Sequence, residues 1–271
     1  MKLPLELART LEKGVSKVRI SRFPLCRWAL LGLIALSTQG FAASDDNLLT
    51  NGGFDEEPFL TGWRVADPAL AESADGPNGK GKAVLLTGNG SGLIEQKVPW
   101  QQDAVFAVEF LFAKASSPSN GAETLQFSLL FNGKESDGAL ILAVTDPQDN
   151  GVYEIQIGTG ETKTSIFPDT IEFRNTEDKA APNFHRLRIV VRAAGENPEF
   201  DVFLGEGAER KFTSEAAGLT TWHVAPAGIS PGLIELKFNV APMRESPVAG
   251  GFLISGVSLV PLSAEEAVKK P

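Results

Sequence analysis

Alternation of apolar and polar residues with a period of two recurs from residue 82 onward, and it constrains the fold of this 271-residue chain more than any other feature. In segment 105–113 it places four apolar side chains on one face of an extended chain: Phe106, Val108, Phe110 and Phe112. The same period recurs in segments 124–131, 153–157, 187–191, 200–204, 234–240 and 252–260. Because successive side chains of a strand point to opposite faces, each segment is predicted to be a strand with one buried face.

Turn-forming residue pairs separate these segments. They are Asn132-Gly133, Asp146-Pro147, Asn150-Gly151, Pro231-Gly232 and Gly250-Gly251. Such pairs favour tight turns between strands, and no amphipathic stretch of helical length lies between them. The predicted fold class is therefore all-β, a single antiparallel jelly-roll β-sandwich of about eight or more strands over residues 43–262. A short charged tail, residues 263–271, is expected to fray.

Residues 1–42 have the composition of a signal peptide. Seven basic residues precede the apolar run 28–36, and the small residues Gly40 and Ala42 fit a cleavage site before Ala43. The run is much shorter than the ~20 residues that span a bilayer, so we predict a removed signal and no stable membrane span. The long basic region leaves a mis-assigned start codon or an uncleaved N-terminal anchor as alternatives. The predicted location is secreted, periplasmic or at the cell surface.

Acidic residues dominate the predicted mature chain. The full chain has 25 basic and 34 acidic residues, and residues 1–42 hold 7 and 2 of these, which leaves 18 and 32 and a net charge of −14. Such a surface repels phosphate backbones and anionic lipids, so nucleic acid is not an expected partner, whereas a neutral glycan is compatible. The only cysteine, Cys26, lies within the predicted signal, so no disulfide is expected in the mature protein.

The segment 47–55, Asn-Leu-Leu-Thr-Asn-Gly-Gly-Phe-Asp, follows the predicted signal directly. Its leucines start an apolar strand, its Asn-Gly-Gly triplet tolerates positive φ, and Phe54 re-enters the core. Gly62-Trp63 has the same arrangement of a flexible residue followed by an aromatic one, and the large Trp ring can cover one end of a sandwich. We interpret these residues as determinants of the fold and not as ligand contacts.

This opening resembles that of galactose-binding-like and family 4/9-type carbohydrate-binding modules. Those jelly rolls begin with Asn-Leu-(Leu/Val)-x-Asn-Gly-Gly-Phe-Glu and reach Gly-Trp a few residues later. Segment 93–98, with Gln96, is similar to a strand that carries a recurrent Gln in these modules. Segments 105–113, 200–204 and 251–259 are similar to later strands, whereas residues 114–185 have no such match. The resemblance implies a jelly roll that binds a glycan.

The resemblance also implies a structural Ca²⁺, held partly by the acid of the opening motif and partly by an Asp in the final strand. The opening acid is present as Asp55, but the final-strand position reads Ser255-Gly256-Val257. Loss of a carboxylate removes charge from the oxygen cage of a hard cation. Asp55 is therefore the only side-chain metal ligand that we name.

The predicted ligand contacts are aromatic, because exposed rings stack on the faces of sugars. Trp100 and Trp222 fall where predicted strands meet loops, and Tyr153 alternates with polar neighbours. Most of the 17 Phe residues fit the core instead. Trp100, Trp222 and Tyr153 are the aromatic candidates for sugar binding.

Two patterns that suggest catalysis are better explained otherwise. Residues 228–232 read Gly-Ile-Ser-Pro-Gly, but Pro231 lacks the backbone N–H that the residue after a nucleophilic serine gives to an oxyanion hole. The only two histidines, His185 and His223, form no zinc-binding pattern and fit packing or rim positions.

Two polar segments are likewise expected to be structural. Residues 146–151 resemble part of a calcium loop, but Ile157 stands where an EF-hand requires a carboxylate, so a turn between strands is predicted. The outward row of Arg186, Arg188 and Arg192 could contact an acidic glycan, but pairing with acids across the strands is the preferred interpretation.

The function that we predict is non-catalytic binding of a neutral oligo- or polysaccharide by an exported protein that is not an enzyme. The alternative is an exported structural or protein-interaction jelly roll that contacts a cell-envelope component without binding sugar. A glycan-active enzyme would require two facing carboxylates in a cleft, and nothing in the sequence selects such a pair.

Overall fold

The computed structural model describes residues 46–88, 92–100, 104–115, 123–133, 138–148, 150–158, 162–173, 182–193, 199–207, 211–220, 232–242 and 250–269. All of these belong to one compact unit, which spans residues 39–271. The predicted signal peptide, residues 1–42, lies outside the described residues, as do His223 and Trp222.

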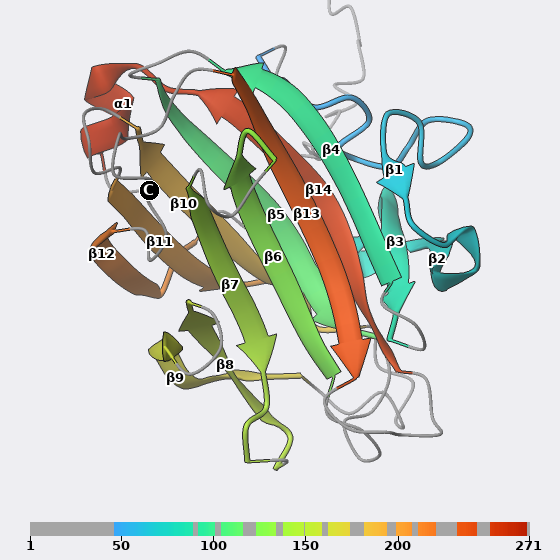
Figure 1. Ribbon diagram of the computed structural model, residues 1–271. Helices are drawn as coiled ribbons and strands as arrows, with labels where there is room; N and C mark the ends of the chain where they lie inside the picture. Colours follow the sequence, from blue (N-terminus) through green and yellow to red (C-terminus); the bar gives the residue numbers. More distant parts are fainter. Residues whose placement is uncertain are drawn as a thin grey trace, which may run out of the picture. The chain divides into compact units, whose positions relative to one another are not determined.

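Two antiparallel sheets form the described part of the chain (Figure 1). Sheet 1 has the strand order β1 (Arg64–Val65), β4 (Gly92–Trp100), β13 (Gly232–Pro242), β6 (Glu123–Phe131), β7 (Ala139–Thr145), β8 (Val152–Ile157) and β9 (Thr164–Glu172). Sheet 2 has the order β12 (Ser214–Thr220), β11 (Glu199–Glu206), β10 (His185–Arg192), β5 (Val105–Lys114), β14 (Gly251–Pro261), β3 (Lys82–Thr87) and β2 (Ala71–Asp75). Two 3₁₀ turns, η1 (Pro68–Leu70) and η2 (Pro77–Gly79), and one short helix, α1 (Ala264–Val268), complete the described elements.

The core lies between the two sheets, as the alternating pattern predicts. Phe110 of β5 in sheet 2 contacts two rings of sheet 1, with ring centroids 5.0 Å from Phe127 and 4.9 Å from Phe238. All three side chains are at least 98% buried. Each predicted strand is present, and the expected all-β sandwich is confirmed.

Some strands of the structure were not predicted, because their sequences do not alternate between apolar and polar residues. β7 has the sequence Ala-Leu-Ile-Leu-Ala-Val-Thr, and all seven residues are buried, so both of its faces are apolar and no alternation results. The edge strands β2 and β12 are mostly polar or small and partly exposed, which hides their period. The tail also differs from the expected frayed end, since Ser263 caps α1 by accepting a hydrogen bond from the Glu266 N–H at 3.3 Å.

The opening segment 47–55 lies against the final strand, β14. Asn47 Oδ1 accepts hydrogen bonds from the backbone N–H of Leu259 (2.9 Å) and of Leu49 (3.2 Å). At Gly52, an added Cβ would lie 1.9 Å from the carbonyl oxygen of Val257, so only glycine permits this approach. The Asn-Gly-Gly motif thus closes the first segment onto the last strand.

The second half of the motif completes this end of the core. The indole N–H of Trp63 donates to the carbonyl oxygen of Asn51 at 3.2 Å, and the ring lies 5.4 Å from that of Phe54. Phe54 is fully buried, and its φ of 58° is in the left-handed region. These contacts confirm the interpretation of the motif as a fold determinant.

Candidate functional site

A row of amide side chains crosses the outer face of sheet 1. Asn239 of β13 is directly opposite Gln126 of β6, Gln126 is opposite Ala143 of β7, and Ala143 is opposite Gln156 of β8. Their sequence neighbours, such as Phe238 and Phe127, point into the core, so the amides point away from it. Adjacent strands are about 4.8 Å apart, so the row extends over roughly 14 Å.

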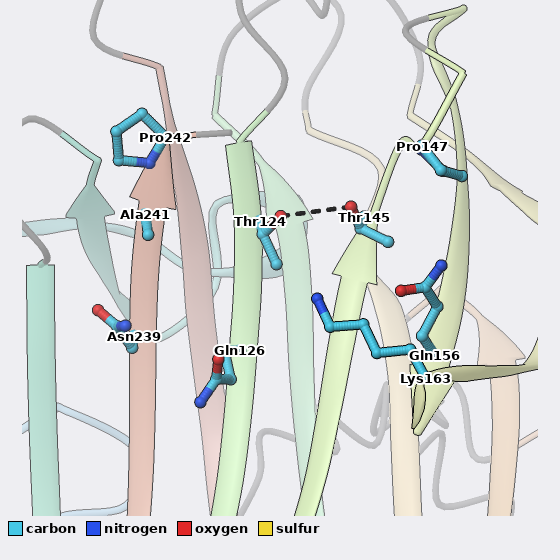
Figure 2. A pocket seen from close by; sticks show the side chains of 9 residues that line it. All are labelled: Thr124, Gln126, Thr145, Pro147, Gln156, Lys163, Asn239, Ala241 and Pro242. Atoms are coloured by element: carbon cyan, nitrogen blue, oxygen red, sulfur yellow. Dashed lines mark hydrogen bonds between the residues drawn. The ribbon is translucent and has the colours of Figure 1, made fainter. Parts of the chain in front are cut away.

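This row lines a pocket of about 320 Å³, which we call the amide pocket (Figure 2). Its lining residues are Thr124, Gln126, Thr145, Pro147, Gln156, Lys163, Asn239, Ala241 and Pro242. The volume is at the low end of the range of about 300–1,000 Å³ that small-molecule sites occupy. Amide and hydroxyl groups form most of its polar lining, and none of the described lining residues is a carboxylate.

Hydrogen bonds fix the orientation of two of the amides. Gln156 donates through Nε2 to Glu154, whose other carboxylate oxygen accepts from Ser165 Oγ at 2.9 Å. Gln126 donates through Nε2 to Ser128 Oγ at 3.2 Å. Each amino group therefore uses one of its two N–H donors within the protein, and the carbonyl oxygens Oε1 remain as acceptors.

Asn239 is the third amide of the row. Its Oδ1 atom is buried and has no hydrogen-bond partner in the described structure. A buried polar atom without a partner costs about 1–3 kcal/mol, so a rotation of this amide that brings Oδ1 to a ligand donor would be favourable. Thr124 and Thr145, whose hydroxyl oxygens are 3.3 Å apart, lie in the next row toward Pro242 (Figure 2).

Lys163 is the one cation among the lining residues, and it directly precedes β9. Figure 2 shows its side chain extended over β7 toward the middle of the pocket. Lys163 is exposed and makes no ion pair within the described ranges. It therefore adds a positive charge without an ion-pair partner among the described residues to a lining of amides and hydroxyls.

Beyond the amide row, acidic and basic side chains lie opposite one another on neighbouring strands of the outer face of sheet 1. Glu95 is paired across strands with Lys237 and with Arg64, and Glu235 with Lys97. Arg64 lies 2.5 Å from Glu95, and the ammonium groups of Lys97 and Lys237 lie 3.1 and 2.9 Å from Glu235. Burial raises the pKa of Glu235, but hydrogen bonds from Lys237 and Lys97 outweigh it, so the pKa is below its ordinary value. Both carboxylates are occupied by cations, which leaves this acidic pair unsuited to general acid catalysis.

The predicted aromatic contacts are not brought together at the pocket. Trp100 is only 7% exposed, and its ring packs edge-on against Phe131 at 5.2 Å, so the expectation of an accessible ring is wrong. Tyr153 is 1% exposed and packs edge-on against Phe173 at 5.0 Å, so it also belongs to the core. Trp222 lies outside the described residues, and its ligand role stays a prediction.

Asp55 is exposed, and its carboxylate lies beside Gly53 and Gly81. Ser255, which stands where the related modules have an Asp, donates through Oγ to the carbonyl oxygen of Lys82 at 2.7 Å. Within the described ranges, no three His, Cys, Asp or Glu side chains are close enough to hold a metal ion. One carboxylate is a sparse ligand set for Ca²⁺, which takes about six to eight oxygens.

The other polar groups singled out in the sequence have structural roles where they are described. His185 is 1% exposed and packs against Phe112 and Phe173, with ring centroids 5.8 and 5.2 Å away. Burial lowers its pKa, and the charge of Glu206 opposes that effect. Asp146 accepts hydrogen bonds from the backbone N–H of Asn150 and Gly151, which makes 146–151 a turn.

The arginine row of β10 pairs with acids across strands, as predicted. Arg186 and Arg188 both contact Glu109 of β5, and Arg192 contacts Asp201 of β11 at 2.7 Å. Of the Gly-Ile-Ser-Pro-Gly segment, the structure describes only Gly232, at the start of β13. None of the described helices is both long and apolar enough to cross a membrane.

The amide pocket was not predicted from the sequence. The period of segment 124–131 places Gln126 on the outward face, but nothing in the sequence indicates that it lies beside Asn239, 113 positions later. The available signal is a polar amide at an outward position in each of three alternating strands. Only the register of the sheet brings these amides into one row.

No protein-family model and no curated protein matches the chain. Among solved structures, it is similar to a GH43 glycoside hydrolase with an engineered active site, described as having both endo-xylanase and exo-arabinofuranosidase activity. The TM-score is 0.51 at 10% identity, and the match covers 82% of this chain and 42% of that chain.

Two carbohydrate-recognition structures also match along most of their length. The Emp47p carbohydrate recognition domain has a TM-score of 0.48 at 14% identity, with 82% of this chain and 97% of that chain covered. The lectin UEA-II complexed with galactose has a TM-score of 0.47 at 13% identity, with 80% and 97% covered. At such identities a likeness concerns the fold alone, and it agrees with the predicted jelly-roll β-sandwich of two antiparallel sheets.

Proposed function

We propose that this chain is a non-catalytic carbohydrate-binding protein that acts outside the cytoplasm and binds an oligo- or polysaccharide in the amide pocket. The observation that carries the proposal is the row of Asn239, Gln126 and Gln156, whose amide side chains line one pocket and whose carbonyl oxygens have no hydrogen-bond partner among the described residues. A sugar presents several hydroxyl donors at close spacing, which matches such a row of acceptors.

Three further observations support this proposal. The fold is one that carbohydrate-recognition domains use, and structures named for binding or hydrolysing carbohydrates are among its matches. The acids Glu95 and Glu235 on the same face are paired with lysine and arginine side chains, and Glu154 accepts hydrogen bonds from Gln156 and Ser165, which favours binding over hydrolysis. The apparent signal in residues 1–42 supports export.

The proposal is tested with a glycan array, on protein purified after expression of the full chain. We expect binding to at least one glycan and a loss of about tenfold or more in the double variant Asn239→Ala/Gln126→Ala, because two hydrogen bonds to the ligand are removed. The control is Leu233→Ala, on the same strand β13, whose side chain is 45% exposed and does not line the pocket. The control should bind as the wild type does.

Two results would contradict the proposal. Failure to bind any glycan, with and without Ca²⁺, would favour the alternative of a structural or protein-interaction jelly roll. Unchanged binding by the double variant would place the sugar site elsewhere, and Trp222→Ala would then test the remaining predicted contact. N-terminal sequencing of the exported protein tests cleavage before Ala43.

A further inference from the structure

We propose that the amide pocket selects a uronic-acid residue, with the sugar hydroxyls on the amides and the sugar carboxylate on Lys163. This inference rests on the proposed function and names the class of saccharide. The overall negative charge of the chain favours a neutral ligand. The pocket itself has a positive charge from Lys163, so an acidic ligand is proposed in its place.

Lys163 gives the pocket its charge preference. Among the lining residues that the structure describes, its ammonium group is the only charged group, and it makes no ion pair with another described residue. By contrast, Lys97 and Lys237 on the same sheet face are each engaged with Glu235. An unpaired lysine beside neutral amides is matched by an anionic ligand group, which forms a charge-assisted hydrogen bond.

The amide oxygens define the other end of the ligand. Asn239 Oδ1 is a buried acceptor without a partner, and the amino groups of Gln126 and Gln156 are already donating to Ser128 and Glu154. The pocket thus presents acceptors along the strands and a cationic donor at the β9 side. A hexuronate carries the complementary set, since its ring hydroxyls donate and its carboxylate accepts.

The strongly acidic composition does not oppose this assignment. Charges more than about 8 Å away are largely screened at physiological ionic strength, so the groups in the pocket dominate. The acid beside the pocket, Glu154, is 9% exposed and does not line it. Its two carboxylate oxygens accept hydrogen bonds from Gln156 and Ser165, which hold it away from the ligand space.

The test uses oligosaccharides of galacturonic, glucuronic, mannuronic and guluronic acid, each beside its carboxyl-reduced counterpart, in which a neutral hydroxymethyl group replaces the carboxylate. We expect the wild-type protein to bind at least one uronate about tenfold more tightly than its reduced form, the scale of one charge-assisted hydrogen bond. Added salt should narrow this difference. Lys163→Gln should abolish the preference and Lys163→Arg should retain it.

Lys80→Gln serves as the matched control. Lys80 is an exposed lysine after η2, beside sheet 2, and does not line the pocket. Its removal changes the net charge as Lys163→Gln does and should leave the preference intact.

Each contrary result has a separate meaning. Equal affinity for the charged and reduced forms would overturn the uronate assignment and leave sugar binding in place. A preference that persists in Lys163→Gln would overturn the role of this lysine. If the protein bound neither the charged nor the reduced form, and no other glycan, the proposed function itself would be overturned.

Discussion

Gln96 on β4 and Thr50 in the opening segment exchange two hydrogen bonds across 46 positions of sequence. The Thr50 N–H donates to Gln96 Oε1 at 2.8 Å, and Gln96 Nε2 donates to the carbonyl oxygen of Thr50 at 2.9 Å. The same Nε2 donates to the carbonyl oxygen of Gly62 at 3.0 Å. One buried amide, 6% exposed, therefore joins both halves of the opening motif to sheet 1.

Replacement of Gln96 by Leu should destabilise the protein. The change leaves one backbone N–H and two carbonyl oxygens without their partner, at about 1–3 kcal/mol for each buried group left unsatisfied. We expect the free energy of unfolding to fall by roughly 2–4 kcal/mol in denaturant titrations. Glycan binding at 25 °C should persist, since Gln96 does not line the amide pocket. A loss below about 0.5 kcal/mol, the scale of a neutral surface substitution, would contradict this role.

The ion pair between Lys114 and Glu123 joins the end of β5 in sheet 2 to the start of β6 in sheet 1. Both side chains are at least 95% buried, and the Lys114 ammonium lies 4.7 Å from the centre of the Phe252 ring. Burial lowers the pKa of Lys114, and the charge of Glu123 partly offsets this. The pair is enclosed by apolar neighbours, where a lone charge is costly.

Lys114→Met should be strongly destabilising, because it leaves the carboxylate of Glu123 buried without a cation. Breaking one partner of a buried pair costs about 3–5 kcal/mol, whereas replacement of both partners by apolar residues is often neutral. The double variant Lys114→Met/Glu123→Leu should therefore recover most of the loss in equilibrium unfolding. If the double variant were as unstable as the single one, the loss would come from packing and not from the unpaired charge.

Strands whose two faces differ in apolar character could be predicted from the sequence, because the difference leaves a period of two. Phe110 of β5 belongs to the core, as its period predicts, although nine of the ten residues of β5 are buried. β7 escaped prediction because both of its faces are apolar, which removes the period. The rule therefore fails where both faces of a strand are apolar.

The candidate site could not be predicted to the same extent. The position of Trp100 at the end of β4 suggested an exposed ring, but exposure depends on Phe131, which is 31 positions away and packs on it. The amide pocket depends on the pairing of β13 with β6, a relation between segments far apart in sequence. Site residues set by long-range register leave no local signal.

Acidification should destabilise the protein through His185. Burial lowers the folded-state pKa of His185 below 6.5, so between that value and 6.5 the unfolded chain binds more protons than the folded chain does. Stability should therefore rise with pH up to about 6.5 and fall as the pH drops through this window. His185→Phe removes the titrating group while keeping a ring between Phe112 and Phe173.

Melting temperatures measured between about pH 5 and pH 7 should show a shallower slope in His185→Phe than in the wild type. Repacking around the new ring would change the melting temperature by the same amount at every pH, so it does not affect the comparison of slopes. Identical slopes would show that other groups account for the acid sensitivity.

Calcium binding can be tested at the contact between Ser255 and Lys82. The family resemblance predicts a Ca²⁺-dependent rise in the melting temperature of the wild-type chain that Asp55→Ala abolishes. Ser255→Asp restores the missing carboxylate at a side chain that is 5% exposed and faces the carbonyl oxygen of Lys82. Without a cation this buried charge should lower the melting temperature, because two oxygens then face each other unscreened.

Added Ca²⁺ should raise the melting temperature of Ser255→Asp more than that of the wild type, since the cation gains a second carboxylate beside that of Asp55. Asp55→Ala in the Ser255→Asp background should reduce this rise, which distinguishes shared coordination from non-specific screening. Mg²⁺ at equal concentration serves as the control, because it demands a tighter octahedral cage. Equal responses to both ions, or no response in Ser255→Asp, would show that this end of the sandwich does not form a calcium site.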